Sequence, residues 1–125
     1  MEEITKAQEE ILKALWNIKE GAVSDVLAVL PEPKPAYTTV ATVIKVLERK
    51  GYVDHKTYGK THVFYPLKSK KDYTSFVLKD AMEGLFNNSL NAMFSFFVKQ
   101  KKNVSLEELE ELRNYLEEEI KKQKS

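Results

Sequence analysis

A stretch in the first half of the chain combines small hydroxyl side chains with a high density of positive charge. Residues 34 to 71 include nine Lys or Arg residues and two acidic residues, a net charge of +7, whereas the whole 125-residue chain has a formal net charge of +1. Clustered basic side chains neutralise nucleic-acid phosphates and release condensed counterions. The stretch therefore favours a nucleic-acid-binding surface, with a solvated lysine-rich surface as the alternative.

Apolar residues at helical spacing within this stretch predict a helix that ends at Gly51 and buries Val40, Ile44 and Leu47. A rotation of about 100° per residue places small and polar side chains on the opposite face. That face consists of Thr38, Ala41, Thr42, Lys45 and Arg49. Such a mixture suits the major groove of DNA, where hydroxyl, methyl and ammonium groups can contact base edges.

Individual side chains of this helix suggest different contacts. Thr42 can offer its hydroxyl to a base and its methyl group to thymine, and Lys45 can reach guanine acceptors or a phosphate. Arg49, near the helix end, is better placed for the DNA backbone. Tyr37, just before the helix, could donate its hydroxyl to a phosphate or pack against the preceding proline-rich turn.

From residue 52 to residue 67 the sequence takes the period of a β-hairpin, with β-forming residues on both sides of Gly59. Lys56, Tyr58 and Lys60 surround the predicted tip, where a wing would meet the sugar-phosphate backbone or an adjacent minor groove. The alternative is an exposed turn whose lysines only keep an edge strand soluble.

Few residues could support catalysis or bind a metal. His55 and His62 would face each other across a hairpin that turns at Tyr58-Gly59, and no serine, histidine and acid arrangement with a recognisable local motif is present. Two imidazoles could begin a metal site, but a tetrahedral site normally needs three or four ligands. We therefore interpret the histidines as a cross-strand pair, and predict no enzyme activity, no metal site and no cofactor.

Composition excludes several other classes of protein. Cysteine is absent, which rules out disulfides, thiolate catalysis, iron-sulfur clusters and cysteine-based zinc sites. No apolar run approaches the roughly 20 residues of a membrane-spanning helix. The acidic start also lacks the basic and apolar segments of a secretory signal. We expect a soluble, cytoplasmic protein without membrane insertion.

Local signals predict two further helices before the basic stretch. Thr5 and Gln8 have the spacing of a capping box, and the apolar residues that follow predict a helix over residues 6 to 18 that Gly21 stops. Ser24 can cap a short second helix, which a proline-rich turn then ends. Together these signals place a tight turn between the second helix and the basic third helix.

The order of the elements is that of a winged helix-turn-helix. Thr38 and Thr39 offer caps for the third helix, and Ala22-Val23 could add a short strand to the hairpin. The predicted fold is α+β and mostly helical. It has a winged helix DNA-binding domain over residues 1–70 and a helical dimerisation domain over residues 71–125.

Residues 71–125 carry more apolar and aromatic side chains than an isolated pair of helices could cover. Ser105 begins a second capping-box pattern before the last helix. Burial of apolar surface at about 25 cal/mol per Å² favours pairing with a second copy, while a core within one chain is the alternative. The predicted homodimer interface includes Phe76, Leu85, Phe86, Leu90, Met93, Phe94, Phe97, Leu109, Leu112 and Leu116.

Four stretches together resemble the BlaI/MecI/CopY family of penicillinase-type repressors. They are Gln8 to Trp16, Tyr37 to Ile44, Leu47 to Val53 and, in the last helix, Glu107 to Leu116. The resemblance implies a homodimeric repressor that binds an inverted-repeat operator and controls β-lactamase or related resistance genes. It also implies inactivation when a membrane-embedded sensor protease signals antibiotic. By position, the operator-reading helix would carry Thr38, Thr39, Ala41, Thr42 and Lys45.

Two features depart from that family pattern. Members inactivated by proteolysis are cut at an Asn-Phe bond before the last helix, but the matching position here is Phe96-Phe97. Either the cleavage rule differs or this repressor is released in another way. The copper-sensing branch carries C-terminal cysteines, which this chain lacks, so we predict no copper sensing.

Two other functions remain open from the sequence. One is a winged-helix regulator that senses a small molecule bound among the aromatic side chains of residues 71–125. The other is a winged helix that serves as a protein-interaction module, in which case the basic stretch would be incidental.

Overall fold

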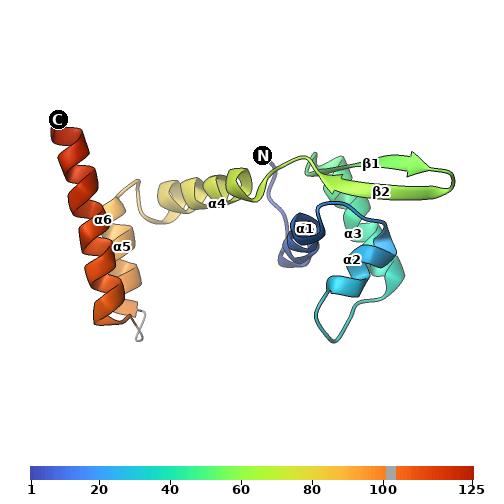
Figure 1. Ribbon diagram of the computed structural model, residues 1–125, viewed down its shortest axis with the longest axis horizontal. Coiled ribbons are helices and arrows are strands. Elements are labelled where there is room, and N and C mark those ends of the chain that lie inside the picture. The colour runs from blue at the N-terminus through green and yellow to red at the C-terminus, as the bar shows by residue number, and fades with distance from the viewer. Residues whose placement is uncertain (101–103) are drawn as a thin grey trace. The chain divides into compact units, whose positions relative to one another are not determined.

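The computed structural model describes residues 1–100 and 104–125 of the chain (Figure 1). The elements are α1 (Lys6–Ile18), α2 (Val23–Val29), α3 (Tyr37–Arg49), β1 (Val53–Tyr58), β2 (Thr61–Pro66), α4 (Lys70–Leu85), α5 (Leu90–Gln100) and α6 (Leu106–Lys124). They confirm the predicted α+β, mostly helical fold with the element order of a winged helix. Among the described residues, no helix is both long and apolar enough to cross a bilayer.

The chain divides into two compact units, Met1–Leu78 and Lys79–Ser125. In the first unit, α3 packs against both α1 and α2, and the β1–β2 hairpin follows α3 (Figure 1). The largest fully buried side chains of this unit are Tyr52, Leu12, Leu15, Ile44, Leu47, Val26, Val40 and Val53. Helices and hairpin therefore share one core within the first unit.

The predicted boundaries of α1 are confirmed, but its end has a different cause. Thr5 Oγ1 accepts from the Gln8 N–H at 3.2 Å, and Gln8 Oε1 accepts from the Thr5 N–H at 3.0 Å, which completes the capping box. The helix ends at Ile18, and the following residue, Lys19, has a φ of 74°. Gly21 instead exchanges backbone hydrogen bonds of 2.9 and 2.8 Å with Phe64 of β2.

The predicted caps of α2 and α3 are wrong. The residue before α2 is Ala22, and the Asp25 carboxylate accepts its N–H at 2.9 Å, so Ser24 lies inside the helix. Alanine also precedes α3, which begins at Tyr37 rather than after Thr38 or Thr39. The predicted strand at Ala22-Val23 is absent, because Val23 already belongs to α2 and only Gly21 pairs with the hairpin.

The start of α4 belongs to the first unit because two aromatic residues attach it there. The Tyr73 hydroxyl donates to the Glu9 carboxylate at 2.6 Å, and Trp16 Nε1 donates to the Lys68 carbonyl at 2.8 Å. The rings of Trp16 and Tyr73 lie 5.8 Å apart. The unit consequently extends to Leu78, beyond the boundary predicted at residue 70.

The second unit contains the end of α4 together with α5 and α6. Ser105 accepts from the Glu108 N–H at 3.0 Å and so caps α6 as predicted. Among the described residues 79–100 and 104–125, none is buried. The second unit thus has helices without a closed core.

Candidate nucleic-acid interface

The orientation of α3 matches the prediction on which the interface depends. Val40, Ile44 and Leu47 are completely buried. Thr42 and Lys45, on the opposite face, are exposed. Thr38 and Arg49 are also exposed, and Ala41 is half-buried. The helix therefore presents to solvent the small and polar face that sequence periodicity predicted.

The hydroxyl of Thr42 has a partner within its own helix. Thr42 Oγ1 donates to the Thr38 carbonyl oxygen at 2.9 Å. With its proton engaged, this oxygen can accept a hydrogen bond from a base amino group, while the methyl group is available for thymine. The contact expected of Thr42 is consequently acceptance or apolar packing rather than donation.

A groove separates α3 from the hairpin. Its α3 side includes Tyr37, Ala41 and Lys45, and its hairpin side includes Lys60 and His62. The first turn of α2, with Ser24, lines its end. Lysines from two elements thus face one concave surface, a shape and charge suited to a nucleic-acid backbone.

The hairpin divides the predicted wing residues between two faces. Tyr58 pairs with Thr61, so that Gly59-Lys60 forms the turn. Side chains alternate along a strand, which places Lys56 and Tyr58 on the face opposite to His62. Lys56 Nζ lies 5.4 Å from the centre of the Tyr65 ring on that other face. Of the three predicted wing residues, only Lys60 lines the groove.

Thr39 also lies apart from the groove. It lines a separate apolar cavity with Ala7 of α1, Leu30, Pro35 and other residues. Tyr37, by contrast, is 55% exposed and lines the groove. The structure therefore brings together Tyr37, Ala41 and Lys45 of α3 but not Thr39.

Two of the basic residues have structural roles within the chain. Lys34 Nζ donates to the carbonyls of Leu27, Ala28 and Leu30 at 2.8–3.2 Å. These bonds satisfy carbonyl groups at the C-terminal end of α2 that have no partner within the helix. Lys50 Nζ donates to the Glu3 carbonyl at 2.9 Å. Within the described part of the chain, Lys45, Arg49 and Lys60 form no ion pair, so their charges face solvent uncompensated.

Sequence reasoning missed His62 and Ser24 as groove residues. His62 lies two positions before the buried Phe64, and strand alternation puts both on the face directed at the helices. That signal was present in the sequence, in the spacing of His62 and Phe64 along one strand. Ser24 carried no such signal, because its position depends on the packing of α2 beside the hairpin.

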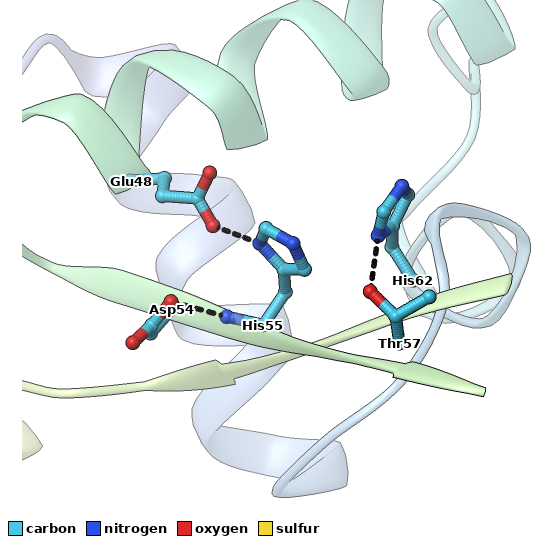
Figure 2. A network of polar contacts seen from close by, with 5 residues as sticks. All are labelled: Glu48, Asp54, His55, Thr57 and His62. Carbon is cyan, nitrogen blue, oxygen red and sulfur yellow. Dashed lines mark hydrogen bonds and ion pairs between the residues drawn. The ribbon is translucent and has the colours of Figure 1, made fainter.

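The predicted direct pairing of the two histidines is wrong by two residues along β2. His55 lies opposite Phe64, and His62 lies opposite Thr57, because the turn is centred on Gly59-Lys60. The two imidazoles are diagonal neighbours with ring centres 4.6 Å apart. Figure 2 shows His55 in contact with Glu48 of α3 and His62 in contact with Thr57.

The residues predicted for a dimer interface are largely accessible in the single chain. Leu85, Leu90, Phe97, Leu109 and Leu116 are exposed. The other five, Phe76, Phe86, Met93, Phe94 and Leu112, are half-buried. Phe76 belongs to the first unit and the remainder to the second. Apolar surface of this extent is what an interface would cover.

Comparison with known families agrees with this architecture. The family model described as penicillinase repressor matches residues 4–118. The chain belongs to the penicillinase repressor family. Members of the penicillinase repressor family are DNA-binding transcriptional repressors, and such repressors are not a class of enzymes. The family prediction made from the sequence is confirmed.

Several relatives in the penicillinase repressor family align with nearly the full chain. The methicillin resistance regulatory protein MecI of Staphylococcus aureus strain N315 is 28% identical over 115 residues, covering 91% of this chain and 93% of its own. The penicillinase repressor of Bacillus licheniformis is 26% identical over 117 residues, covering 93% and 91% respectively.

Among solved structures, Bordetella bronchiseptica BpsR aligns with 92% of this chain and 74% of its own, with 15% identity and a TM-score of 0.49.

Proposed function

We propose that this chain is a cytoplasmic homodimeric repressor that reads an inverted-repeat operator with α3 and the adjoining hairpin. Its targets would be a β-lactamase gene or a related resistance gene, in keeping with the named functions of its relatives. The orientation of α3 is the observation that carries the proposal. With Val40, Ile44 and Leu47 buried, Thr42 and Lys45 necessarily face outward.

In this proposal some residues contact base edges and others contact the DNA backbone. Thr42 and Lys45 lie mid-helix, where side chains reach base edges in the major groove. Tyr37 and Lys60 line the same groove from its two sides and would contact phosphates. Arg49 would hold the backbone near the end of α3, as would Lys56 and Tyr58 on the outer face of the hairpin.

The dimer in this proposal would form through the second unit. Its exposed leucines and phenylalanines would be covered by the same surface of a second copy, as expected for a two-fold symmetric interface. Two winged-helix units related by such symmetry would read two half-sites of opposite direction. The inverted repeat is therefore a consequence of the dimer and not a separate assumption.

Release from the operator would not follow the Asn-Phe rule implied by the family resemblance. The position that matches the rule, Phe96-Phe97, lies within α5 and has no asparagine. We propose that a membrane sensor protease, where one acts on this repressor, acts indirectly or at another bond.

Binding titrations with an operator and with random DNA test the division of roles. Thr42→Ala and Lys45→Ala should weaken operator binding by about 1–3 kcal/mol each, with less effect on random DNA. Lys60→Ala should weaken both DNAs alike and reduce the slope of the salt dependence by about 1. Equal losses of affinity for both DNAs in every variant would contradict the assignment of Thr42 and Lys45 to base contacts.

A matched control is available on α1. Lys13 is a lysine of the same unit whose ammonium is paired with Glu9 at 3.2 Å. Lys13→Ala removes one positive charge away from the groove and should leave both affinities within twofold of the parent. If Lys13→Ala matched Lys45→Ala, net charge alone would explain the binding and α3 would not be the reading element.

A further inference from the structure

A cluster of metal-ligating side chains joins the end of α3 to the start of β1. Glu48 comes from α3, and Asp54 and His55 come from β1 (Figure 2). One potential ligand atom from each of the three lies within 4.8 Å of the other two. The three residues connect α3 with β1, and the proposed DNA reading requires these two elements to keep a fixed position relative to each other.

Both sides of the cluster are held in place by hydrogen bonds. His55 Nδ1 contacts the Glu48 carboxylate, and Asp54 Oδ1 accepts from the His55 backbone N–H at 2.8 Å. The His55 ring also rests on Phe64, with ring centres 5.5 Å apart. A ligand set that is already restrained loses little conformational entropy when it binds an ion.

His62 provides a second imidazole beside the cluster. Its ring centre lies 4.6 Å from that of His55, at an interplanar angle of 84°. Thr57 Oγ1 lies 3.1 Å from His62 Nδ1, which leaves Nε2 of His62 available as a ligand. Orientation of a ligating imidazole through its other nitrogen is the usual arrangement in protein metal sites.

The donor set determines which ions it could bind. Imidazole nitrogens combined with carboxylate oxygens suit zinc and similar first-row divalent ions, whereas magnesium and calcium prefer oxygen ligands alone. Zinc bonds to these donors are about 2.0–2.2 Å long, so side-chain movements of about 1 Å would bring the ligand atoms of Glu48, Asp54 and His55, which lie within 4.8 Å of one another, to bonding distance. His62 would join them by rotation of its side chain. Glu48 and His55 are about two-thirds shielded, at 31% and 32% side-chain exposure, which leaves an entry path.

We propose that Glu48, Asp54 and His55, together with the adjacent His62, form a binding site for one divalent transition-metal ion such as zinc. Metal binding displaces the imidazole proton that the Glu48 carboxylate otherwise accepts. The bound ion ties the C-terminal end of α3 to the hairpin through bonds that neither element can make alone. The ion thereby fixes the angle between the helix and the wing.

The composition of the chain makes the test direct. There are two histidines and no cysteine in all 125 residues, so imidazole-based zinc binding involves this pair. Zinc is titrated into the full-length protein without DNA, and binding is followed by calorimetry and by NMR of the imidazole protons. The expected result is saturation at one zinc per chain, with the signals of both histidines shifted.

Variants separate a metal site from an ordinary ion pair. His55→Gln and His62→Gln should each weaken zinc binding by at least tenfold, and Glu48→Gln should do the same. Glu110→Gln on α6 removes an equivalent charge in the second unit and should leave zinc binding unchanged. Trp16 fluorescence confirms that the first unit, which holds the cluster, remains folded in each variant before it is titrated.

Two outcomes would overturn the site. One is the absence of saturable binding at zinc concentrations up to 100-fold above the protein, in which case Glu48 and His55 form only an ion pair. The other is zinc binding that His55→Gln and His62→Gln leave unchanged. Because the titration contains no DNA, either outcome leaves the proposed repressor function untouched.

Discussion

The two units of this chain bury their apolar side chains to very different extents. In Met1–Leu78, residues from three helices and the hairpin close a core in which Leu12, Ile44 and Tyr52 have no exposed surface. Within the described part of Lys79–Ser125 no residue is buried, and Leu85 is 76% exposed. The first unit has a complete core in one copy of the chain, whereas the second does not.

This difference separates two kinds of stability. A closed core stabilises its unit at any protein concentration, but an apolar face completed by a second copy contributes in proportion to dimerisation. If the comparison is correct, substitutions in the first unit should change folding, and substitutions in the second should change assembly.

The largest expected effect comes from placing a charge on the apolar face of α6. Leu116 is 43% exposed in the single chain, and Leu116→Glu would remove its burial twice in a symmetric dimer. The lost apolar burial, together with the cost of burying a charge without a partner in both copies, should weaken the proposed dimer by about 3–6 kcal/mol. Sedimentation should then show a monomer at concentrations where the parent is a dimer.

The control for this substitution lies two residues away on the same helix. Asn114 is about 200° around α6 from Leu116, so Asn114→Glu adds the same charge on the other side. It should leave the dimer intact. Dissociation by both variants alike would show that charge, and not loss of apolar burial, separates the subunits.

The next effect is expected from a cavity in the closed core. Ile44→Ala removes a completely buried side chain from α3 and should lower the free energy of unfolding by about 2–5 kcal/mol. Denaturation followed by the fluorescence of Trp16, the only tryptophan, reports on the first unit. Ile120→Ala on α6, where the side chain is 54% exposed, should leave this transition nearly unchanged. Equal shifts would contradict the contrast between the units.

The smallest effect concerns the bond that attaches α4 to the first unit. Donation by the Tyr73 hydroxyl is the main cause that lowers the pKa of Glu9 below its ordinary value of 4.5, and burial raises the pKa of Tyr73. Tyr73→Phe should cost about 1 kcal/mol at neutral pH. Tyr58→Phe, at an exposed tyrosine of the hairpin, serves as the control.

The pH dependence of this bond has a defined sign. Because the pKa of Glu9 is lower in the folded than in the unfolded chain, its contribution is complete above about pH 4.5 and is lost as the pH falls through the lowered value. Unfolding followed from pH 7 to pH 3 should therefore show the parent and Tyr73→Phe converging in acid. A difference in unfolding free energy that stays constant at every pH would mean that Tyr73 does not lower the pKa of Glu9.

Local signals in the sequence predicted the parts of the fold that depend on local interactions. The Thr5 and Gln8 spacing predicted the start of α1, and the apolar period of α3 predicted its buried face. The starts of α2 and α3 were missed because both follow alanines, which have no capping oxygen. For α2, the carboxylate of Asp25, three residues further on, takes over part of that function.

Features that depend on distant parts of the chain could not be predicted in the same way. The position of the hairpin turn decided which residues lie opposite His55 and His62, and a shift of its centre by one residue changed both partners. The approach of Glu48 to His55 depends on how α3 packs against β1. Likewise, Lys34 lies in a basic stretch, yet its ammonium donates a hydrogen bond to a backbone carbonyl at the end of α2.

Selection of bound sequences from a random pool of double-stranded DNA tests the central claim most directly, because the pool contains every candidate half-site. A dimer that presents α3 twice should enrich an inverted repeat whose half-site centres lie about one or two helical turns apart, roughly 10 or 21 base pairs. Lys45→Ala should relax the preference at defined positions within each half-site. Enrichment of a single asymmetric motif, or of no motif at all, would contradict a symmetric pair of reading helices.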